Sequence, residues 1–312
     1  MTSAMVFPGQ GSQSVGMLGA LGASEPVVRA TFDSASAVLG YDLWELAQAG
    51  PAELLGSTER TQPAMLTAGV AVWRAWLARG GEVPAALAGH SLGEFTALVC
   101  GGAFDFDDAV ALVQFRGRAM QEAVPVGEGA MAAILGLEDA AVEAACREAA
   151  GDEVVEAVNY NSPGQLVIAG NAKAVARAIE ACKAKGAKRA LLLPVSVPAH
   201  SSLLAGAGER LAERLASVTV RAPSIPVYAI GLGRHQLPAT IRADLVRQLS
   251  RPVRWSDTIT DILRHGATRI IECGPGKVLT ALNRRIHRDK AIAMQAIEDP
   301  DSLAAALAPQ ET

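Results

Sequence analysis

Gly89-His90-Ser91-Leu92-Gly93 is the stretch on which the prediction of the fold depends. Residues 83–88 before it are small and mostly apolar, which is typical of a buried strand in a parallel sheet. Residues 94–99 after it contain no helix breaker and favour a helix. A G-x-S-x-G motif between a strand and a helix is the pattern of a nucleophile elbow, whose serine hydroxyl projects above the sheet. We therefore predict that Ser91 is a nucleophile, with a serine that only caps the helix as the alternative.

Two backbone segments are candidates for binding an oxyanion beside this serine. The N–H of Leu92 lies in the first turn of the predicted helix, where the helix dipole favours negative charge. Residues 8–13, Pro-Gly-Gln-Gly-Ser-Gln, follow a predicted strand at residues 4–7 and can bring N–H groups close to a ligand. They do not form a dinucleotide-binding G-x-G-x-x-G motif, because Ser14 occupies the last glycine position. On this segment alone an ordinary tight turn is the favoured interpretation.

The composition limits the class of protein. The 312 residues are enough for about two domains, and half of them are hydrophobic, which allows a large core. The net charge of −4, without a long run of one sign, argues against nucleic acid as the main ligand. Four cysteines without a C-x-x-C pair or zinc spacing predict buried free thiols and no metal site. No segment has the pattern of a signal peptide or membrane span, so we expect a soluble cytoplasmic protein with no membrane partner.

Residues 106–122 predict an amphipathic helix that carries one arginine on its apolar side. At 100° per residue, the apolar face consists of Ala109, Leu112, Val113 and Met120. Arg118 lies on the polar face, whereas Arg116 lies in the middle of the apolar stripe. An unpaired buried charge is very costly, so Arg116 must face a cavity, join an internal ion pair or extend its charged end to solvent. The helical pattern leaves these alternatives open.

The middle of the chain has a different order of predicted elements. Strand, helix, strand, strand, helix, strand are expected at residues 131–135, 139–149, 154–158, 166–169, 172–185 and 189–193. This is the ferredoxin-like order. We therefore expect an α/β fold with a discontinuous large domain, residues 1–125 and 195–312, around a parallel sheet. An inserted ferredoxin-like subdomain is expected at residues 126–194.

A nucleophilic serine needs a proton acceptor, and the chain has five histidines. His90 is adjacent to the serine, so its side chain leaves the turn in another direction. His235 is assigned to a polar loop, His265 to a polar helix end and His287 to a basic run. His200 lies where an apolar strand ends in a proline-bounded loop, a position at which α/β proteins place catalytic groups. By elimination His200 is the predicted base, and no carboxylate is identified to orient it.

Further motifs extend along nearly the whole chain. Besides the elbow with Glu94, they lie at residues 7–13, 116–117, 120–125, 159–165, 197–200, 246–249 and 274–277. In this order they resemble the malonyl-CoA:acyl carrier protein transacylases of fatty acid synthesis. The resemblance implies an α/β-hydrolase-like core with a ferredoxin-like insertion, which the pattern of predicted elements indicates independently.

The resemblance also implies roles for particular residues and for partners. It implies that Ser91 is the nucleophile and His200 the base, with the N–H groups of Gln10 and Leu92 binding the oxyanion. It also implies that Arg116 binds the malonyl carboxylate and that the backbone carbonyl of Gln248 orients the histidine. The expected partners are malonyl-CoA and acyl carrier protein, and neither a metal nor a redox cofactor is expected. Two basic clusters, residues 183–189 and 284–290, are candidate contacts for an acidic carrier protein, with solvated helix ends as the alternative.

The sequence departs from the family in two places. Ala199 stands where relatives often carry Ser or Phe, which leaves open whether 2-alkyl malonyl groups are excluded. Residues 228–231, Tyr-Ala-Ile-Gly, replace an Asn-rich strand end.

Three other functions compete with malonyl transfer to acyl carrier protein. The transacylase subunit of a malonate decarboxylase would share every motif. A serine esterase would share the elbow, but a buried Arg116 disfavours an acyl chain without an anion. A carrier-protein adaptor without enzymatic activity would not need Ser91.

Overall fold

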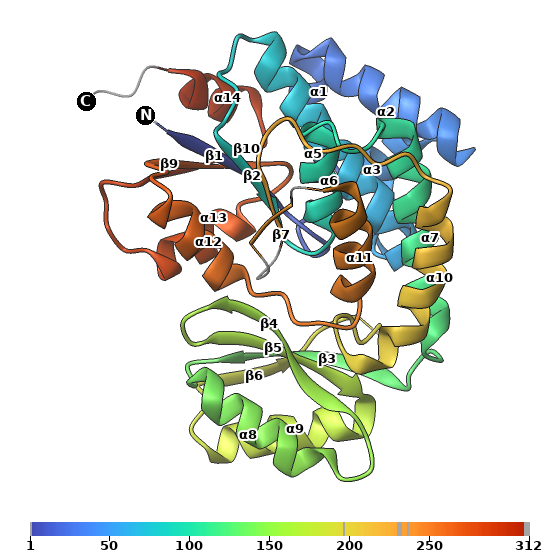
Figure 1. Ribbon diagram of the computed structural model, residues 1–312, viewed down its shortest axis with the longest axis vertical. Coiled ribbons are helices and arrows are strands. Elements are labelled where there is room, and N and C mark those ends of the chain that lie inside the picture. The colour runs from blue at the N-terminus through green and yellow to red at the C-terminus, as the bar shows by residue number, and fades with distance from the viewer. Residues whose placement is uncertain (1, 196, 230–232, 236, 309–312) are drawn as a thin grey trace.

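The computed structural model describes residues 2–195, 197–229, 233–235 and 237–308. Two sheets organise these residues (Figure 1). The larger sheet has the strand order β10-β9-β1-β2-β7-β8, and the smaller has the order β4-β5-β3-β6. Within the described residues, every helix is too short or too polar to cross a lipid bilayer.

The larger sheet is parallel except at one edge. Its strands are β1 (Ser3–Phe7), β2 (Ala86–Gly89), β7 (Val227–Ala229), β8 (Gly233–His235), β9 (Arg269–Cys273) and β10 (Ala293–Ile297). Strand β8 pairs antiparallel with β7, where Arg234 is opposite Tyr228 and donates hydrogen bonds to the Tyr228 hydroxyl oxygen at 2.9 and 3.1 Å. The sequence did not predict this hairpin, and Ile230 and Gly231 of the departing segment lie outside the described residues.

Both faces of the larger sheet are covered, because its strands alternate apolar side chains between two cores. In β1, Met5 and Phe7 pack into one core, while Ala4 and Val6 pack into the other. The first core contains α1 (Gly19–Ser24), α2 (Pro26–Leu39), α3 (Leu43–Ala49), α4 (Ala52–Leu55), α5 (Thr58–Ala78), α6 (Leu92–Cys100), α7 (Phe106–Ala123), α10 (Ala205–Ala216), α11 (Pro238–Gln248) and α14 (Pro300–Leu307). The second contains α12 (Trp255–Arg264) and α13 (Val278–Ile286). The α/β class with a parallel sheet is therefore confirmed.

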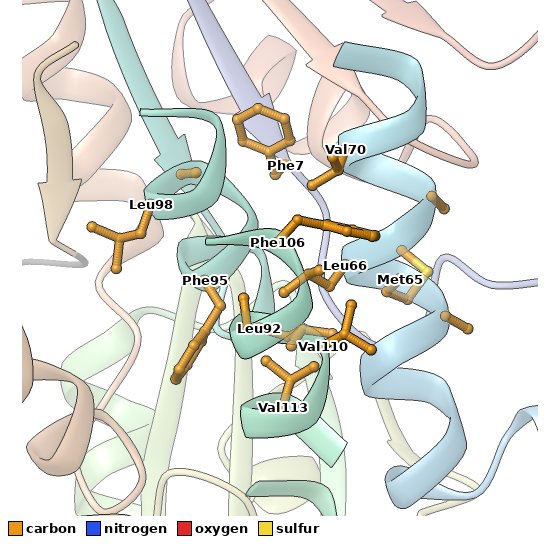
Figure 2. Packing of buried hydrophobic residues seen from close by; sticks show 14 of the residues in the cluster. Phe7, Met65, Leu66, Val70, Leu92, Phe95, Leu98, Phe106, Val110 and Val113 are labelled. Atoms are coloured by element: carbon orange, nitrogen blue, oxygen red, sulfur yellow. The ribbon is translucent and has the colours of Figure 1, made fainter. Parts of the chain in front are cut away.

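Helix α6, which follows the serine, is embedded in the first core (Figure 2). Its Leu92 and Phe95 are 1% and 0% exposed, and the side chains of α5 and α7 lie around them. Such packing fixes the start of α6 firmly, since interiors of this density resist displacement. The residue just before α6 is thereby held in place.

The smaller sheet is antiparallel and carries helices on one face. It consists of β3 (Gly129–Leu135), β4 (Val155–Ser162), β5 (Gln165–Asn171) and β6 (Arg189–Leu192), with α8 (Asp139–Ala150) and α9 (Ala172–Ala184). The two helices pack on the face opposite the larger sheet (Figure 1). On the other face, Met131, Val167 and Ala169 pack towards Val195 and Ala199. The chain order of these elements agrees with the ferredoxin-like prediction.

The thiols are free, as expected, but not all are buried. Cys146, Cys182 and Cys273 are buried, whereas Cys100, at the end of α6, is only partly buried. The expectation of four buried thiols was therefore wrong for Cys100.

Candidate active site

Ser91 occupies a sharp turn between β2 and α6, with φ 52° and ψ −107°. This is an unfavourable backbone conformation for a residue with a side chain, and such conformations concentrate at functional sites. Both flanking glycines are required by close backbone approach. A Cβ on Gly89 would lie 1.8 Å from the carbonyl carbon of Gly93, and a Cβ on Gly93 would lie 2.0 Å from the carbonyl oxygen of Phe7. The turn therefore has the geometry of a nucleophile elbow.

His200 is the histidine that reaches Ser91. Its Nε2 lies 2.7 Å from the Ser91 Oγ, and its Nδ1 lies 2.7 Å from the carbonyl oxygen of Gln248. Because a carbonyl only accepts, Nδ1 carries the proton, and Nε2 is left to accept the hydrogen bond of the serine hydroxyl. His200 itself has φ 67°, so both members of the pair sit in strained backbone.

Burial controls the protonation of this histidine. Burial, and next the positive charge of Arg116, lower the pKa of His200 to about 3, while the hydrogen bond to Gln248 opposes the shift. The imidazole is therefore neutral at physiological pH and can accept a proton from Ser91.

Arg116 lies beside the serine and is 1% exposed. Its Nη1 donates to the Gln62 Oε1 at 2.8 Å, and its Nη2 donates to the Gln248 Oε1 at 2.8 Å and to the Ser91 Oγ at 3.3 Å. Its Nε has no hydrogen-bond partner among the described residues. Burial lowers the pKa of Arg116 to about 10, partly offset by the charge of Glu94, so the guanidinium remains charged at neutral pH.

A cavity of about 470 Å³ connects these groups. Ser91, Leu92, Arg116 and His200 line it together with Gln10 from the loop after β1. Leu92 is the first residue of α6, so its N–H belongs to the first turn, which has no acceptor within the helix. Ala199 and Met131 also line the cavity, so the smaller sheet forms part of its wall. The predicted site residues are therefore brought together, with Gln248 contacting them from behind the cavity lining.

Arg118 and His90 lie where the sequence predicted. The Arg118 side chain is 52% exposed and pairs with Glu59 at 2.9 Å. The His90 Nε2 lies 2.8 Å from the Asn161 Oδ1 and so engages the smaller sheet.

The placement of His235 in a polar loop was wrong. It lies in β8, is 3% exposed, and its Nε2 is 2.6 Å from the Oε1 of the buried Glu94. The sequence reasoning also missed Gln62 as a partner of Arg116. Glu94 could have been noticed, because it is a charged residue at the head of an otherwise apolar helix.

An α/β fold, a nucleophile elbow and a neutral histidine within hydrogen-bond distance of its serine define a class: enzymes that attack acyl carbonyls with a serine. Comparisons narrow that class. Residues 4–303 match the family model of the acyl transferase domain. The malonyl CoA-acyl carrier protein transacylase of Escherichia coli (strain K12) is 55% identical over 97% of this chain and 98% of that protein. The enzyme of the same name from Bacillus subtilis (strain 168) is 41% identical over 97% of this chain and 96% of that protein.

Solved structures agree. The structure of the malonyl CoA-acyl carrier protein transacylase from Coxiella burnetii has a TM-score of 0.96 and 47% identity, covering 98% of this chain and 97% of that one. A malonyl-transacylase in complex with its type II PKS acyl-carrier protein has a TM-score of 0.96 and 51% identity, covering 98% of this chain and 99% of that one. The chain therefore belongs to the acyl transferase domain family, and within it to the malonyl CoA-acyl carrier protein transacylases.

Proposed function

We propose that this protein transfers the malonyl group of malonyl-CoA to the phosphopantetheine thiol of acyl carrier protein, for fatty acid synthesis. The observation that carries the proposal is a charged, buried guanidinium beside the candidate nucleophile. Arg116 Nη2 lies 3.3 Å from the Ser91 Oγ, and among the described residues the guanidinium donates hydrogen bonds to two neutral amide oxygens and the serine hydroxyl, and lies over the Phe95 ring. A planar fork of N–H donors binds a carboxylate in two parallel hydrogen bonds, and a malonyl thioester carries a free carboxylate.

The first half of the reaction loads the serine. Ser91 Oγ attacks the thioester carbonyl while its proton passes to the Nε2 of His200. The N–H groups of Gln10 and Leu92 stabilise the oxyanion of the tetrahedral intermediate. The C–S bond then breaks, and coenzyme A leaves as a thiol with the proton from His200. A malonyl-Ser91 ester remains.

The second half reverses these steps with another thiol. His200 takes the proton of the phosphopantetheine thiol, and the sulfur attacks the ester carbonyl. The C–O bond to Ser91 breaks, and the serine oxygen recovers a proton from His200. The carbonyl of Gln248 keeps the Nδ1 proton in place in both halves. The exchange of one thioester for another changes no oxidation state, so the proposed steps need no redox cofactor. The N–H groups of Gln10 and Leu92 supply the oxyanion stabilisation in these steps.

The basic clusters support a docking face for an acidic carrier protein. Arg285 donates to Gln165 of β5. Gln165 is opposite Leu135 of β3, which is opposite Arg189 of β6. Since neighbouring strands are about 4.8 Å apart, the backbones of Gln165 and Arg189 lie roughly 10 Å apart. Arg285 and Arg189 therefore lie at the same end of the smaller sheet. Lys183 and Lys185 contribute less charge, because Glu180 and Glu148 pair with them.

We also propose the domain division 1–125 with 195–312, and 126–194. It is supported by a separate hydrophobic cluster whose buried residues, between positions 130 and 182, come from the smaller sheet and from α8 and α9. A cytoplasmic location remains a prediction from the sequence.

Intact mass measurement tests the reaction. Malonyl-CoA alone should add one malonyl group to the protein, Ser91→Ala should abolish the adduct, and holo-acyl carrier protein should remove it. A stoichiometric adduct on Ser91→Ala would refute the mechanism. A malonyl adduct that passes to the carrier subunit of a malonate decarboxylase, but not to acyl carrier protein, would identify the malonate decarboxylase alternative. Hydrolysis of neutral esters in preference to malonyl transfer would identify the serine esterase.

A further inference from the structure

A chain of buried polar groups continues behind Arg116. The Gln248 Oε1 accepts from Arg116, and its Nε2 donates to the Glu94 Oε2 at 2.7 Å and to the Ser91 carbonyl at 3.1 Å. The other carboxylate oxygen of Glu94, Oε1, lies 2.6 Å from the His235 Nε2. Glu94 is 2% exposed and His235 is 3% exposed. No step of the proposed transfer reaction uses these two residues.

The carboxylate of Glu94 determines which way the Gln248 amide faces. A carboxylate accepts hydrogen bonds and a guanidinium donates them. If the amide were turned over, its NH₂ would face the donors of Arg116 and its oxygen would face the acceptors of Glu94. Both contacts would be repulsive and would leave buried polar groups unsatisfied, which is costly. Glu94 therefore holds the amide oxygen against Arg116.

Gln248 acts on the site through two separate groups. Its backbone carbonyl, at the end of α11, accepts the Nδ1 hydrogen bond of His200. Its side-chain amide contacts Arg116. Because the amide can turn without moving the backbone carbonyl, a change at Glu94 alters the contact with the guanidinium and leaves the hydrogen bond between His200 and the Gln248 carbonyl in place.

His235 holds the carboxylate that controls this amide. It enters from β8, the hairpin strand at the edge of the larger sheet, and its Nδ1 faces Asp244 of α11 at 3.4 Å. Asp244 in turn pairs with Arg247. The groups around the Glu94 carboxylate are therefore the imidazole of His235 on one side and the Gln248 amide on the other, with the guanidinium of Arg116 beyond that amide.

We infer that His235 is a positioning residue for malonyl selectivity: through Glu94 and Gln248 it fixes the plane of the Arg116 guanidinium. The inference rests on the proposed function, because it assumes that Arg116 binds the malonyl carboxylate. It assigns a role to a residue of β8, the strand that pairs with β7 next to the departing segment. Loss of His235 should impair use of malonyl-CoA and spare use of acetyl-CoA.

The experiment compares kcat/KM for malonyl-CoA and acetyl-CoA in purified full-length variants. His235→Phe keeps a ring but removes the donor, and we expect it to lower the malonyl-to-acetyl ratio roughly tenfold, mainly through the KM for malonyl-CoA. His235→Gln supplies an amide N–H to Glu94 and should restore the ratio to within about threefold. His265→Phe, at a histidine whose side chain is 51% exposed and which also contacts a carboxylate, should leave the ratio unchanged. The ratio does not depend on how much of a variant is folded, because both substrates are measured on one sample.

A double-mutant cycle completes the test. In an Arg116→Ala background, His235→Phe should have no further effect on the malonyl-to-acetyl ratio, because the guanidinium that His235 positions is absent. Equal losses on both substrates, an unchanged ratio in His235→Phe, or the same loss in the Arg116→Ala background would overturn the inference. If the wild-type protein does not prefer malonyl-CoA, the proposed function itself fails, which is a separate outcome.

Discussion

Replacement of Arg116 by alanine is the most informative perturbation of the site. The guanidinium has five N–H donors, and its two short hydrogen bonds go to the amide oxygens of Gln62 and Gln248. Neither partner carries charge. The wild-type site thus holds a buried cation with N–H donors that make no short hydrogen bond. A malonyl carboxylate that binds to them would convert the cation into a buried ion pair.

The size of the effect follows from this geometry. Truncation of one partner of a buried, hydrogen-bonded charge pair costs about 2–5 kcal/mol, and about 1.4 kcal/mol corresponds to a factor of ten. The cavity of about 470 Å³ admits water to the vacated space, which partly solvates the substrate carboxylate. We therefore expect the lower part of the range, a fall of roughly 30- to 300-fold in kcat/KM for malonyl-CoA.

Acetyl-CoA should respond differently. An acetyl group offers no anion, so in the wild type it leaves the buried guanidinium without a charged partner. Arg116→Ala removes that penalty, so kcat/KM for acetyl-CoA should stay the same or rise. Arg116→Lys keeps the charge but loses the planar fork and one of the two amide contacts, so its malonyl activity should fall between those of the wild type and Arg116→Ala.

The assay is the malonyl-to-acetyl ratio of kcat/KM for loading of the serine. Arg118→Ala is the matched control, because Arg118 lies on the same helix with a half-exposed side chain paired to Glu59. If the ratio is unchanged in Arg116→Ala, or if Arg118→Ala shifts it as much, Arg116 is a structural arginine and the reasoning is wrong.

Three further predictions concern the base, the elbow and the docking face. Because the pKa of His200 is lowered to about 3, kcat/KM should show no acid limb between pH 8 and about 5, and a limb centred near 6.5 would contradict this. Because of the same shift, the His200 side chain binds a proton below pH 6.5 in the unfolded protein but stays neutral in the folded protein until the pH approaches 3. Stability should therefore fall by about 1.4 kcal/mol per pH unit from this group as pH drops below 6.5, a slope that His200→Ala should lack in urea unfolding. Gly93→Ala should lower Tm severely, because its Cβ would lie 2.0 Å from the Phe7 oxygen, whereas Gly206→Ala, in open space on α10, should be neutral or slightly stabilising; similar Tm values would refute the packing argument. Charge reversal at Lys188, Arg189 and Arg285 should slow transfer to acyl carrier protein about tenfold at low salt and spare transfer to free pantetheine, and equal effects on both acceptors would rule out docking there.

The features that the sequence predicted well depend on local spacing. The elbow could be predicted because strand, turn and helix are contiguous, and the helical period alone placed Arg116 in a buried stripe. For both of these features the evidence lay within about one turn or one strand of the residue itself. His200 was chosen by elimination from an expected strand end, but β6 ends at Leu192 and His200 lies in the loop that follows it.

The contacts that no local pattern predicted join distant segments. Arg116 and Gln248 are 132 positions apart, and His235 and Glu94 are 141 positions apart. Strand β8 was missed because it has three residues, two of them exposed, and therefore lacks an apolar pattern. Such a strand is formed by pairing with β7, where Tyr228 and Arg234 face each other, rather than by its own composition.

Glu94 shows how far the local argument could have gone. A carboxylate at the head of an apolar helix carries the same signal as an arginine in an apolar stripe, since both must be buried and both require partners. Helices α6 and α7 follow each other in the chain, so opposite charges on their buried faces could have been expected to share one site. The sequence does not show that the Gln248 side chain lies between these two charges. Opposite charges in contact would have saturated Arg116, whereas the amide of Gln248 separates them and leaves guanidinium donors for a substrate anion. On the proposed function, the selectivity of the site thus depends on a neutral side chain that neither periodicity nor charge patterning singles out.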